Sequence, residues 1–490
     1  MSSKVMVIGG GLAGITAAIA LAESGADVTL LEARPRLGGA TCSFSRDGLT
    51  VDTGQHVFLG CCSAYRGLLA RLGMTEHAPL QDRFDVTVLA PGGSGGYGGV
   101  DPPVRGRFRG VGPPGAGRAP GADGRPRQAR LRRTALPGPL HMLPALGRYP
   151  FLSFAERMSV GRPALGMRRV NPADPAVDTQ RFGDWLAKRG QSERTRRALW
   201  DLFSVSALNI AGDDASLALA AVVVKTGLLG KNNAADIGVP ALPLGELHGD
   251  AGATLLAKLG AQVVMGTKVS AVEPVPHGGY RIQLAQGDPV TADAVVLAVP
   301  HEKAAALIPA GALPERTVAG WAGLGASPIV NVHVIYDRPV MDLPFVAAID
   351  SPVQWVFDRT RISGLDRPGP ENPQKHQYLA ISLSAADDYA DTPAARLREI
   401  FVPALAELFP AARDAQVAEF FVTRERRATF RQAPGTAALR PKAATQQPGL
   451  VLAGAWTDTG WPDTMEGAVR SGLAAAAELK ASLSTIGVSK

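Results

Sequence analysis

Residues 4–39 read KVMVIGGGLAGITAAIALAESGADVTLLEARPRLGG, and this stretch decides the fold. Lys4 to Ile8 is a short apolar strand, and a GxGxxG turn follows at residues 9–14. After the turn, apolar residues recur at the spacing of one helix face: Leu12, Ile15, Ile19 and Ala22. A second apolar strand, Ala26 to Leu31, ends on Glu32. The order of these parts predicts a βαβ unit.

Each part of this unit has a physical role in binding a dinucleotide. Gly9 permits the tight turn, Gly11 lets a pyrophosphate approach the backbone, and Gly14 lets helix and strand pack closely. The positive end of the helix faces the phosphates. Glu32, 18 residues past Gly14, is placed to accept hydrogen bonds from an adenosine ribose. The complete unit therefore predicts dinucleotide binding over a purely structural βαβ unit.

Length and composition limit the number of domains and the class of protein. At 490 residues the protein exceeds one small core, so two or three packed domains are expected. Its 46% hydrophobic and 19% charged residues are typical of a soluble globular protein. The uncharged run within residues 4–23 resembles a signal peptide or anchor, but its glycine turn and following strand assign it to the nucleotide fold. No other uncharged apolar run approaches the roughly 20 residues that span a bilayer.

The basic charge is concentrated in one segment. The chain carries a net +7, and residues 91–133 alone hold nine Arg against two Asp, which is also +7. The remainder is neutral on balance. Tyr97 and Phe108 are the segment's only candidates for base stacking. A nucleic-acid partner is therefore not expected.

The same region differs in composition from the rest of the chain. Residues 91–130 contain 13 Gly, 7 Pro and 7 Arg, with no Leu, Ile or Met. Such a low-complexity insertion cannot bury enough apolar surface to offset its ordering entropy, so it is expected to be disordered. It is either a genuine insertion or out-of-frame translation of GC-rich DNA, and ordered sequence is expected to resume at Leu131.

Cysteine and histidine spacing indicates no metal site. Cys42, Cys61 and Cys62 show neither CxxC spacing nor a paired framework, which suits a reducing cytoplasm. The eight histidines form no HExxH or similar array.

The middle of the chain predicts a helical lobe followed by a second sheet. Helical or strongly apolar patterns cover 141–166, 180–200 and 216–229. Such helices are usually core, and the alternative is that part of them lines a lipid channel or rests on a membrane surface. Helices are also expected at 246–259 and 394–409. Strands are expected at 262–266, 268–274, 280–284, 292–300, 328–337, 353–358, 377–384 and 417–423.

The last ordered piece repeats the order strand, loop, helix. Leu450 to Ala453 is an apolar strand, residues 454–464 form a loop, and Met465 to Leu479 is a helix. Small residues recur along this helix at a spacing that lets another backbone or a ring approach: Gly467, Ala468, Ser471, Gly472 and Ala475.

These elements predict an α/β protein with a discontinuous nucleotide-binding domain. A Rossmann-like domain is assembled from residues 1–80, 242–300 and 440–482. A substrate-binding domain of antiparallel sheet plus helices takes 131–241 and 301–439. The chain therefore leaves the first domain and re-enters it twice.

Several motifs together resemble one family. Gly38-Gly39 follows Glu32 at the spacing found in flavoproteins of the amine oxidase and carotenoid desaturase superfamily. Four further pieces resemble the squalene-associated FAD-dependent desaturases within it: GLVLAGAWTDTGWPDTMEGAVRSG, SPVQWVFDRT, RRATFRQAPG and ADIGVPALPLGELHGD. The terminal motif, residues 449–472, separates this group from general amine oxidases better than the first glycines do. The resemblance covers nearly the whole chain except the insertion.

The resemblance implies FAD as the cofactor and places its contacts. The ADP end would be held by Gly9, Gly11, Leu12, Ala13, Gly14, Glu32, Ala33, Gly38 and Gly39. Val269 would contact the adenine through backbone groups. Gly454, Thr464 and Met465 would lie along the flavin, with a helix N-terminus directed at its electron-rich pyrimidine edge.

Two positions depart from the family pattern. Ala455 stands where the superfamily usually has an acid bonded to the ribityl hydroxyls, and Ala40 stands where many relatives have Arg. Either these roles pass to neighbours, namely Asp458, Asp463 and Arg34, or backbone amides suffice.

The resemblance implies reductive removal of an allylic hydroxyl from hydroxysqualene, giving squalene for hopanoid synthesis. An acid must protonate the leaving oxygen. The candidates are His56, Asp52, His301, Asp463 and Glu466. His56 is the first choice, because it follows the glycine of DTGQH near where relatives place residues by the flavin; the alternative is a hydrogen-bonded structural histidine. Asp52 is expected to cap a turn and Glu466 to complement a helix dipole. Trp456 and Trp461 either form a cation-tolerant wall or pack beside the flavin.

The same motifs are compatible with three other functions: a phytoene-type carotenoid desaturase, an amine oxidase, or a flavin-fold scaffold without activity. No second βαβ unit with a GxGxxG turn is present for a nicotinamide, so an external reductant is expected. The protein is expected to be cytoplasmic. Because the expected isoprenoid substrate is apolar, peripheral contact with the inner face of the membrane is also expected.

Overall fold

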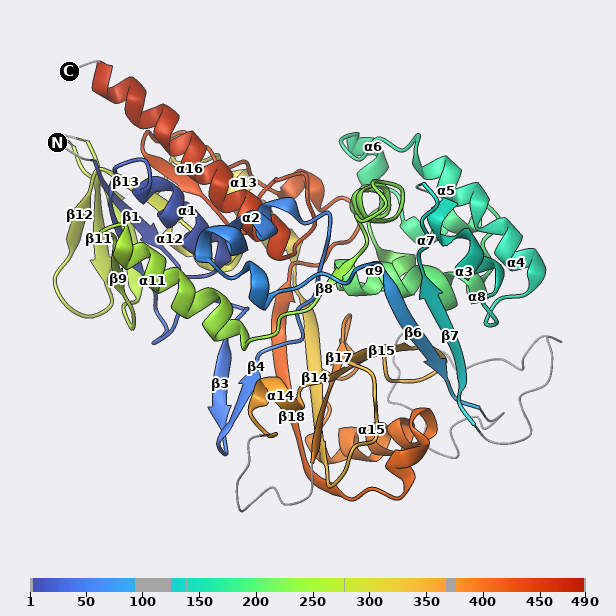
Figure 1. The fold of residues 1–490 in the computed structure, drawn as a ribbon. Helices are drawn as coiled ribbons and strands as arrows, with labels where there is room; N and C mark the ends of the chain where they lie inside the picture. The colour runs from blue at the N-terminus through green and yellow to red at the C-terminus, as the bar shows by residue number, and fades with distance from the viewer. Residues whose placement is uncertain (1–2, 93–124, 138–139, 277, 367–375, 489–490) are drawn as a thin grey trace.

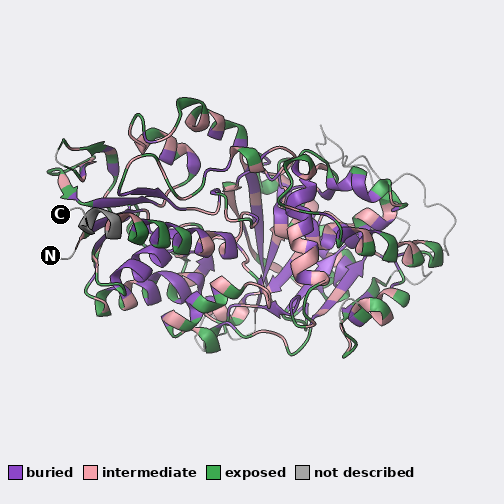
Figure 2. Cartoon of the chain, turned by 90° about the horizontal axis from the view of Figure 1, so that it is seen from above, coloured by how far each residue is buried: buried purple, intermediate pink, exposed green. Residues whose placement is uncertain are grey.

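The computed structural model describes residues 3–92, 125–137, 140–276, 278–366 and 376–488 (Figure 1). Both chain ends lie at one end of the molecule, beside a parallel sheet, and a group of short helices lies at the other end. Strands of a second large sheet run below and between them. Buried residues follow the strands and inner helix faces, while exposed residues cover the outer helices (Figure 2).

The parallel sheet is built around the first strand. In the described chain it has five strands in the order β19-β13-β1-β2-β9. Strand β1 (Lys4–Ile8) pairs with β2 (Asp27–Leu31) on one side and β13 (Ala294–Leu297) on the other. The edges are β9 (Gln262–Val264) and β19 (Leu450–Leu452). All four pairings are parallel, so strands from distant parts of the chain share one carboxyl edge.

Helix α1 (Leu12–Ala22) is buried along its whole length, because it lies between this sheet and α16 (Met465–Val488). The predicted close approach of the small-residue face is confirmed: a Cβ on Gly472 would lie 2.3 Å from the Ala13 carbonyl oxygen. The helices α2 (Ser63–Leu72) and α11 (Ala251–Lys258) complete this layer. The predicted βαβ unit and terminal strand-loop-helix thus pack on each other.

Smaller strands flank the parallel sheet. An antiparallel three-stranded sheet contains β10 (Val269–Pro274), β11 (Tyr280–Leu284) and β12 (Val290–Ala292). A hairpin of β3 (Ser43–Arg46) and β4 (Leu49–Asp52) and a pair of β5 (Phe58–Leu59) and β8 (Ile237–Gly238) follow the glycine pair. Helices α12 (His301–Leu307) and α13 (Glu315–Gly320) follow β13.

The second large sheet is mixed, which corrects the expectation of a purely antiparallel sheet. Its order in the described chain is β18-β14-β17-β16-β15-β6-β7, and the β6/β15 pair is parallel. Neither β6 nor β15 was predicted, because each is short and shows no clear alternation. Helices α14 (Thr360–Ser363) and α15 (Ala394–Leu408) follow strands of this sheet, and α15 packs on β18. The strands are β6 (Asp85–Ala90), β7 (Arg127–Arg132), β14 (Ser327–Tyr336), β15 (Phe345–Ala348), β16 (Trp355–Asp358), β17 (Gln377–Leu383) and β18 (Val417–Thr429).

Strand β7 also corrects the predicted end of the insertion. Residues 127–130 were assigned to the disordered segment, but they pair with β6 in register from Arg127 to Arg130. Alternating Ala129 and Leu131 are buried there, although the surrounding arginines hide this pattern in the sequence. Residues 93–124, the bulk of the predicted insertion, lie outside the described residues.

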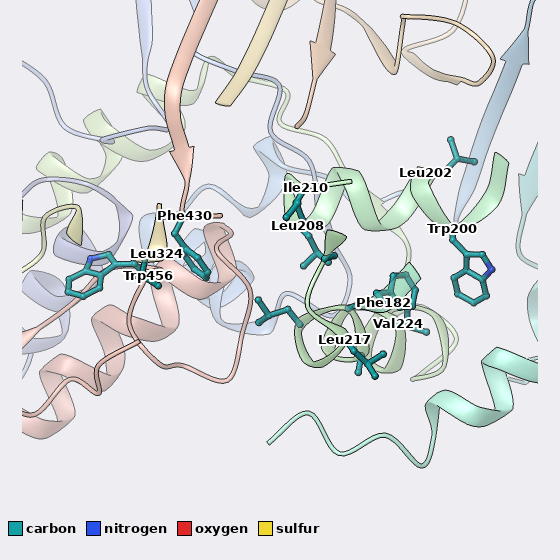
Figure 3. Close-up of a cluster of buried hydrophobic side chains, with 14 of the residues drawn as sticks. Phe182, Trp200, Leu202, Leu208, Ile210, Leu217, Val224, Leu324, Phe430 and Trp456 are labelled. Atoms are coloured by element: carbon teal, nitrogen blue, oxygen red, sulfur yellow. The ribbon is translucent and has the colours of Figure 1, made fainter. Parts of the chain in front are cut away.

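Short helices form the lobe at the far end: α3 (Leu143–Gly147), α4 (Phe154–Ser159), α5 (Gly161–Met167), α6 (Pro175–Asp178), α7 (Phe182–Ala187), α8 (Glu193–Thr195), α9 (Asp201–Leu208) and α10 (Leu217–Val223). The helical pattern predicted over 180–200 is divided, because Gly190 takes a φ of 77° and Ser192 caps a new helix. One apolar cluster joins this lobe to Trp456 near the end of the chain (Figure 3).

Candidate functional site

The glycine turn leaves the start of α1 open. Gly9 has a φ of 109°, and a Cβ on Gly14 would lie 1.8 Å from the Gly9 carbonyl oxygen. Both positions therefore require glycine for the turn itself. Gly11 differs: it precedes α1 in an extended conformation with no side-chain cap, and a Cβ there would meet only the Gly39 Cα at 3.8 Å. The first helix amides of Leu12, Ala13 and Gly14 have no intrahelical acceptor.

The second glycine pair lies against this turn. The Gly38 amide donates to the Gly10 carbonyl at 2.8 Å, and Gly38 forms a parallel bridge with Gly11. A Cβ on Gly39 would lie 2.9 Å from the Gly11 Cα. The structure thus brings two motifs that are far apart in the sequence into backbone contact.

Glu32 lies at the end of β2 beside the turn. Its carboxylate accepts from the Gly10 amide at 2.6 Å and from the Arg34 amide at 2.8 Å, and the side chain is buried. Ala33, next to it, is exposed. The Glu32 carbonyl also accepts from the Thr267 amide, which brings the segment leading to Val269 to the same edge.

The terminal loop reaches the same carboxyl edge of the sheet, because β19 is parallel to β1. Gly454 has a φ of 139°, and its amide donates to the Ser471 hydroxyl at 2.8 Å. The Thr464 hydroxyl accepts from the Gly467 amide at 3.2 Å and so caps α16, whose first residue, Met465, is half-buried. Two helix N-termini, of α1 and α16, therefore open on one edge.

Arg440 holds this loop in place. Its buried guanidinium donates to the carbonyl oxygens of Ala455 at 3.0 Å, Trp456 at 3.3 Å, Thr457 at 2.5 Å and Trp461 at 2.8 Å. A single side chain thus fixes the backbone around Ala455, the position where the resemblance predicts an acid. Sequence reasoning missed Arg440, because no motif surrounds it.

Residues 12–480 match the family of flavin containing amine oxidoreductases. The chain belongs to this family. The predicted membership of the amine oxidase and carotenoid desaturase superfamily is confirmed. The predicted cofactor, FAD, is confirmed as well.

Individual relatives agree with this assignment. The chain is 29% identical to hydroxysqualene dehydroxylase of Rhodopseudomonas palustris, over 97% of this chain and 98% of that protein. It is 23% identical to a chloroplastic 15-cis-phytoene desaturase of Narcissus pseudonarcissus, over 96% and 78%. Among solved structures, putrescine oxidase aligns over 98% of this chain and 99% of its own, with a TM-score of 0.68 at 18% identity. The last likeness shows the fold, and the α/β class is confirmed.

The residues at the carboxyl edge fit FAD. A Cβ would fill the space beside Gly11, and uncapped helix amides face that space, which suits a pyrophosphate. The remaining lone pairs of Glu32 suit ribose hydroxyls. These are the residues that would hold the ADP end, while Gly454, Thr464 and Met465 would hold the flavin end. Their individual contacts stay predictions.

Asp52 forms a buried ion pair with Arg359, which corrects its predicted role as a turn cap. Asp52 ends β4, Arg359 precedes α14, and both are almost fully buried. The other carboxylate oxygen accepts from the Ser43 hydroxyl at 2.6 Å and the Leu244 amide at 3.0 Å. Asp52 therefore ties three separate segments together, and it is satisfied by these partners.

Replacing Arg359 with Met should lower the free energy of unfolding by roughly 3–5 kcal/mol, because Asp52 would remain buried without its counter-charge. Denaturant unfolding followed by circular dichroism measures this loss. Arg338→Met is the matched control: Arg338 pairs with Asp337 at the exposed surface, where a pair contributes about 0–1 kcal/mol. Equal losses in both variants would contradict a special role for the buried pair.

His56 lies beside this ion pair. Its Nδ1 donates to the Gly54 carbonyl at 3.2 Å, which leaves Nε2 as an acceptor in the neutral ring. Burial, the largest cause, lowers the pKa of His56; the Gly54 carbonyl and Asp52 oppose this shift, and Arg359 adds to it. His56 is therefore neutral near pH 7, and it accepts a hydrogen bond more readily than it gives a proton.

Two amide oxygens near His56 lack partners among the described residues: Gln55 Oε1 and Asn331 Oδ1, both buried. Asn331 donates through its Nδ2 to the Thr53 carbonyl at 3.2 Å, so it lies next to the His56 segment. Buried acceptors are normally satisfied, so these two are candidates to receive a ligand hydroxyl. Neither amide was predicted. Asn331 belongs to β14 of the second large sheet, so no sequence pattern places it beside His56.

Asp463 lies where the terminal loop meets the second sheet. Its Oδ2 accepts from the Phe430 amide at 2.9 Å, and its own amide donates to the Gln432 side chain at 3.1 Å. No described group donates to Oδ1. Burial raises the pKa of Asp463 to about 6, against the lowering effects of the Phe430 amide and Arg440. Asp463 can therefore carry a proton near neutral pH.

The structure favours packing as the role of both tryptophans. Trp456 is buried, donates to the Val299 carbonyl at 2.9 Å and packs edge-on against Trp321 at 4.9 Å between ring centroids. The guanidinium of Arg470 lies 4.6 Å from the centroid of the Trp461 ring, so one face of that ring already meets a cation.

The two remaining acid candidates have structural partners. Glu466 is buried, and its carboxylate accepts from the Ala64 and Tyr65 amides at 3.1 and 2.7 Å. It therefore caps the neighbouring helix α2, in addition to lying in the first turn of its own. Burial lowers the pKa of His301 to about 4, and its Nε2 lies 2.9 Å from Glu302.

Proposed function

We propose that this flavoprotein reductively dehydroxylates hydroxysqualene to squalene. The observation that carries the proposal is the similarity to hydroxysqualene dehydroxylases, which runs at 28–29% identity over nearly the full length of both chains. Desaturases match at lower identity and over a smaller share of their own length. The half-buried carboxyl group of Asp463 and the acceptors near His56 suit a substrate that loses a hydroxyl.

The reaction balances when the substrate receives one proton and one hydride. The carbon–oxygen bond breaks, the hydroxyl leaves as water after gaining a proton, and a hydride takes its place on carbon. Bound FAD in its reduced form would provide the hydride chemistry, and an external reductant would be needed to reduce it again. The protein must supply the proton, orient the hydroxyl and exclude water.

Named side chains can meet these needs. Protonated Asp463 gives its proton to the leaving oxygen, so it is the proposed general acid. His56 Nε2, Gln55 Oε1 and Asn331 Oδ1 are acceptors that can orient the hydroxyl. The Phe430 amide holds the Asp463 carboxyl in place.

One apolar cluster joins the helical lobe to the terminal loop, and its composition suits a long hydrocarbon. It runs from Trp456, Leu324 and Phe430 beside the terminal loop to Phe182 and Trp200 in the helical lobe (Figure 3). Side chains of this kind beside the reacting carbon would keep water away and so strengthen electrostatic effects there. The helices predicted to line a lipid channel belong to this cluster, and the channel itself remains a proposal.

A product analysis tests the function. FAD-loaded protein should convert hydroxysqualene to squalene under a chemical reductant without oxygen, and it should leave phytoene unchanged when quinone is the oxidant. Gas chromatography with mass detection measures both products. Heat-denatured protein with free reduced FAD controls for uncatalysed reduction. Desaturated phytoene without squalene would instead support the second candidate, a phytoene-type desaturase, which the similarity to 15-cis-phytoene desaturases favours.

A further inference from the structure

The helical lobe exposes an unusual stripe of large apolar side chains. Phe154 is 73% exposed, Met158 69% and Leu165 63%, the three highest values among the exposed large hydrophobic residues of the described chain. Leu140 and Leu143, on the segment that leads to α4, are also exposed. Single exposed apolar residues are ordinary, but such a grouping marks an interaction surface.

The three side chains share one face. Helices α4 and α5 follow each other almost without a break, because the intervening Val160 keeps a helical φ of −60° and ψ of −30°. At 3.6 residues per turn, Met158 and Leu165 stand about one and three turns after Phe154. Buried Val160, Pro163 and Met167 lie on the opposite face, against the lobe. The stripe therefore points away from the core.

Arginines flank the stripe on both sides. By the same helical spacing, Arg162 and Arg169 lie along one side, and Arg157 and Arg168 along the other. Residues 136–169 contain five Arg against one Glu, a net +4. That Glu156 is turned to the lobe, where it accepts from the Ser192 hydroxyl at 2.6 Å. Among the described residues, Arg162, Arg168 and Arg169 form no ion pair.

We propose that this face, defined as the exposed side of α4 and α5, docks on an anionic lipid bilayer. An apolar stripe between rows of cations is the pattern of a helix that lies in the membrane interface, with its apolar side chains among the acyl chains and its arginines at the phosphates. No helix of the described chain is long and apolar enough to cross a bilayer, so the contact is with one leaflet. The face lies at the end of the molecule away from both termini (Figure 1).

Vesicle sedimentation without substrate tests this docking, independently of the proposed reaction. The holoenzyme should bind vesicles of phosphatidylcholine with phosphatidylglycerol and bind pure phosphatidylcholine vesicles less. Phe154→Ser with Met158→Ser should weaken binding to both by about 100-fold, because two large side chains lose their apolar contact. Arg162→Gln with Arg169→Gln should weaken binding to the anionic vesicles alone, by about tenfold.

Leu343→Ser is the matched control. Leu343 is 39% exposed on the loop between β14 and β15, away from this face, so its replacement should leave binding unchanged. All variants should keep the melting temperature of the parent, since the altered side chains are exposed. Equal binding by the parent and the Phe154/Met158 variant would overturn the proposal. A parent protein that does not bind vesicles would also overturn the proposal. This holds whether that protein is a monomer or forms dimers that the variant abolishes.

Discussion

Replacing Asp463 with Asn should lower turnover of hydroxysqualene by about 100- to 10,000-fold while FAD stays bound. The amide is nearly the same size and can still accept from the Phe430 amide, so the loop should keep its shape. It cannot give a proton to the leaving hydroxyl. Stopped-flow oxidation of the reduced enzyme by substrate measures the loss, and the flavin spectrum measures cofactor content.

The pH profile gives a second test of this residue. Because the pKa of Asp463 is raised to about 6, its proton is present below that pH and is lost as the pH rises. Turnover should therefore be highest below pH 6 and fall by up to tenfold for each further pH unit. The Asn variant should lose this dependence along with its activity.

Two controls separate Asp463 from its neighbours. Glu478→Gln changes an exposed carboxylate on the following helix, α16, and should leave turnover unchanged. His56→Gln should retain FAD and the falling pH profile, with weaker substrate binding, if His56 orients the hydroxyl. Full activity in Asp463→Asn together with loss of the pH profile in His56→Gln would make His56 the acid.

Replacing Gly11 with Val should weaken FAD binding by about 100-fold without unfolding the protein. The new side chain fits the protein alone, because a Cβ at Gly11 meets only the Gly39 Cα at 3.8 Å. It would occupy the space next to the first amides of α1 and so displace a pyrophosphate from roughly two charge-assisted hydrogen bonds. Titration of the FAD-free protein with FAD, followed by fluorescence quenching, measures the affinity.

A neighbouring glycine provides the contrast. Gly14→Ala places a Cβ 1.8 Å from the Gly9 carbonyl oxygen, so this change should destabilise the fold itself. Gly67→Ala on α2, where a Cβ meets nothing within 4 Å, should leave FAD binding unchanged and raise the free energy of unfolding by up to about 1 kcal/mol, because alanine favours a helix more than glycine does. A Gly11→Val protein that still binds stoichiometric FAD at the parent's affinity would show that the glycine turn does not hold the cofactor.

Much of the nucleotide-binding layer could be predicted, because its signals are local. The strands at Lys4–Ile8 and Leu450–Leu452 and the helices after them agree with their sequence patterns within a residue or two at their starts. Apolar periodicity and glycine spacing record which face of an element is buried. Elements with weaker patterns were missed or misjudged, such as β15 and the arginine-rich β7.

The polar part of the candidate site could not be predicted, because its partners come from distant segments. Asp52 meets Arg359 across 307 positions, and Glu466 caps a helix 401 positions earlier. Arg440 is embedded in a stretch without a motif, yet it holds four carbonyl groups of the terminal loop. No local pattern encodes such contacts.

The sequence by itself determined the family, the cofactor and the two strand-turn-helix units that open on one edge of the parallel sheet. Short-range periodicity and backbone geometry carry that information. Only the tertiary structure decided which acid candidate can hold a proton near neutral pH. The pKa of Asp463 is raised by the burial that other segments impose, whereas Asp52 and Glu466 meet a cation and backbone amides brought from elsewhere in the chain. The solvent exposure of the Phe154 stripe was likewise set by which helix face the lobe left uncovered.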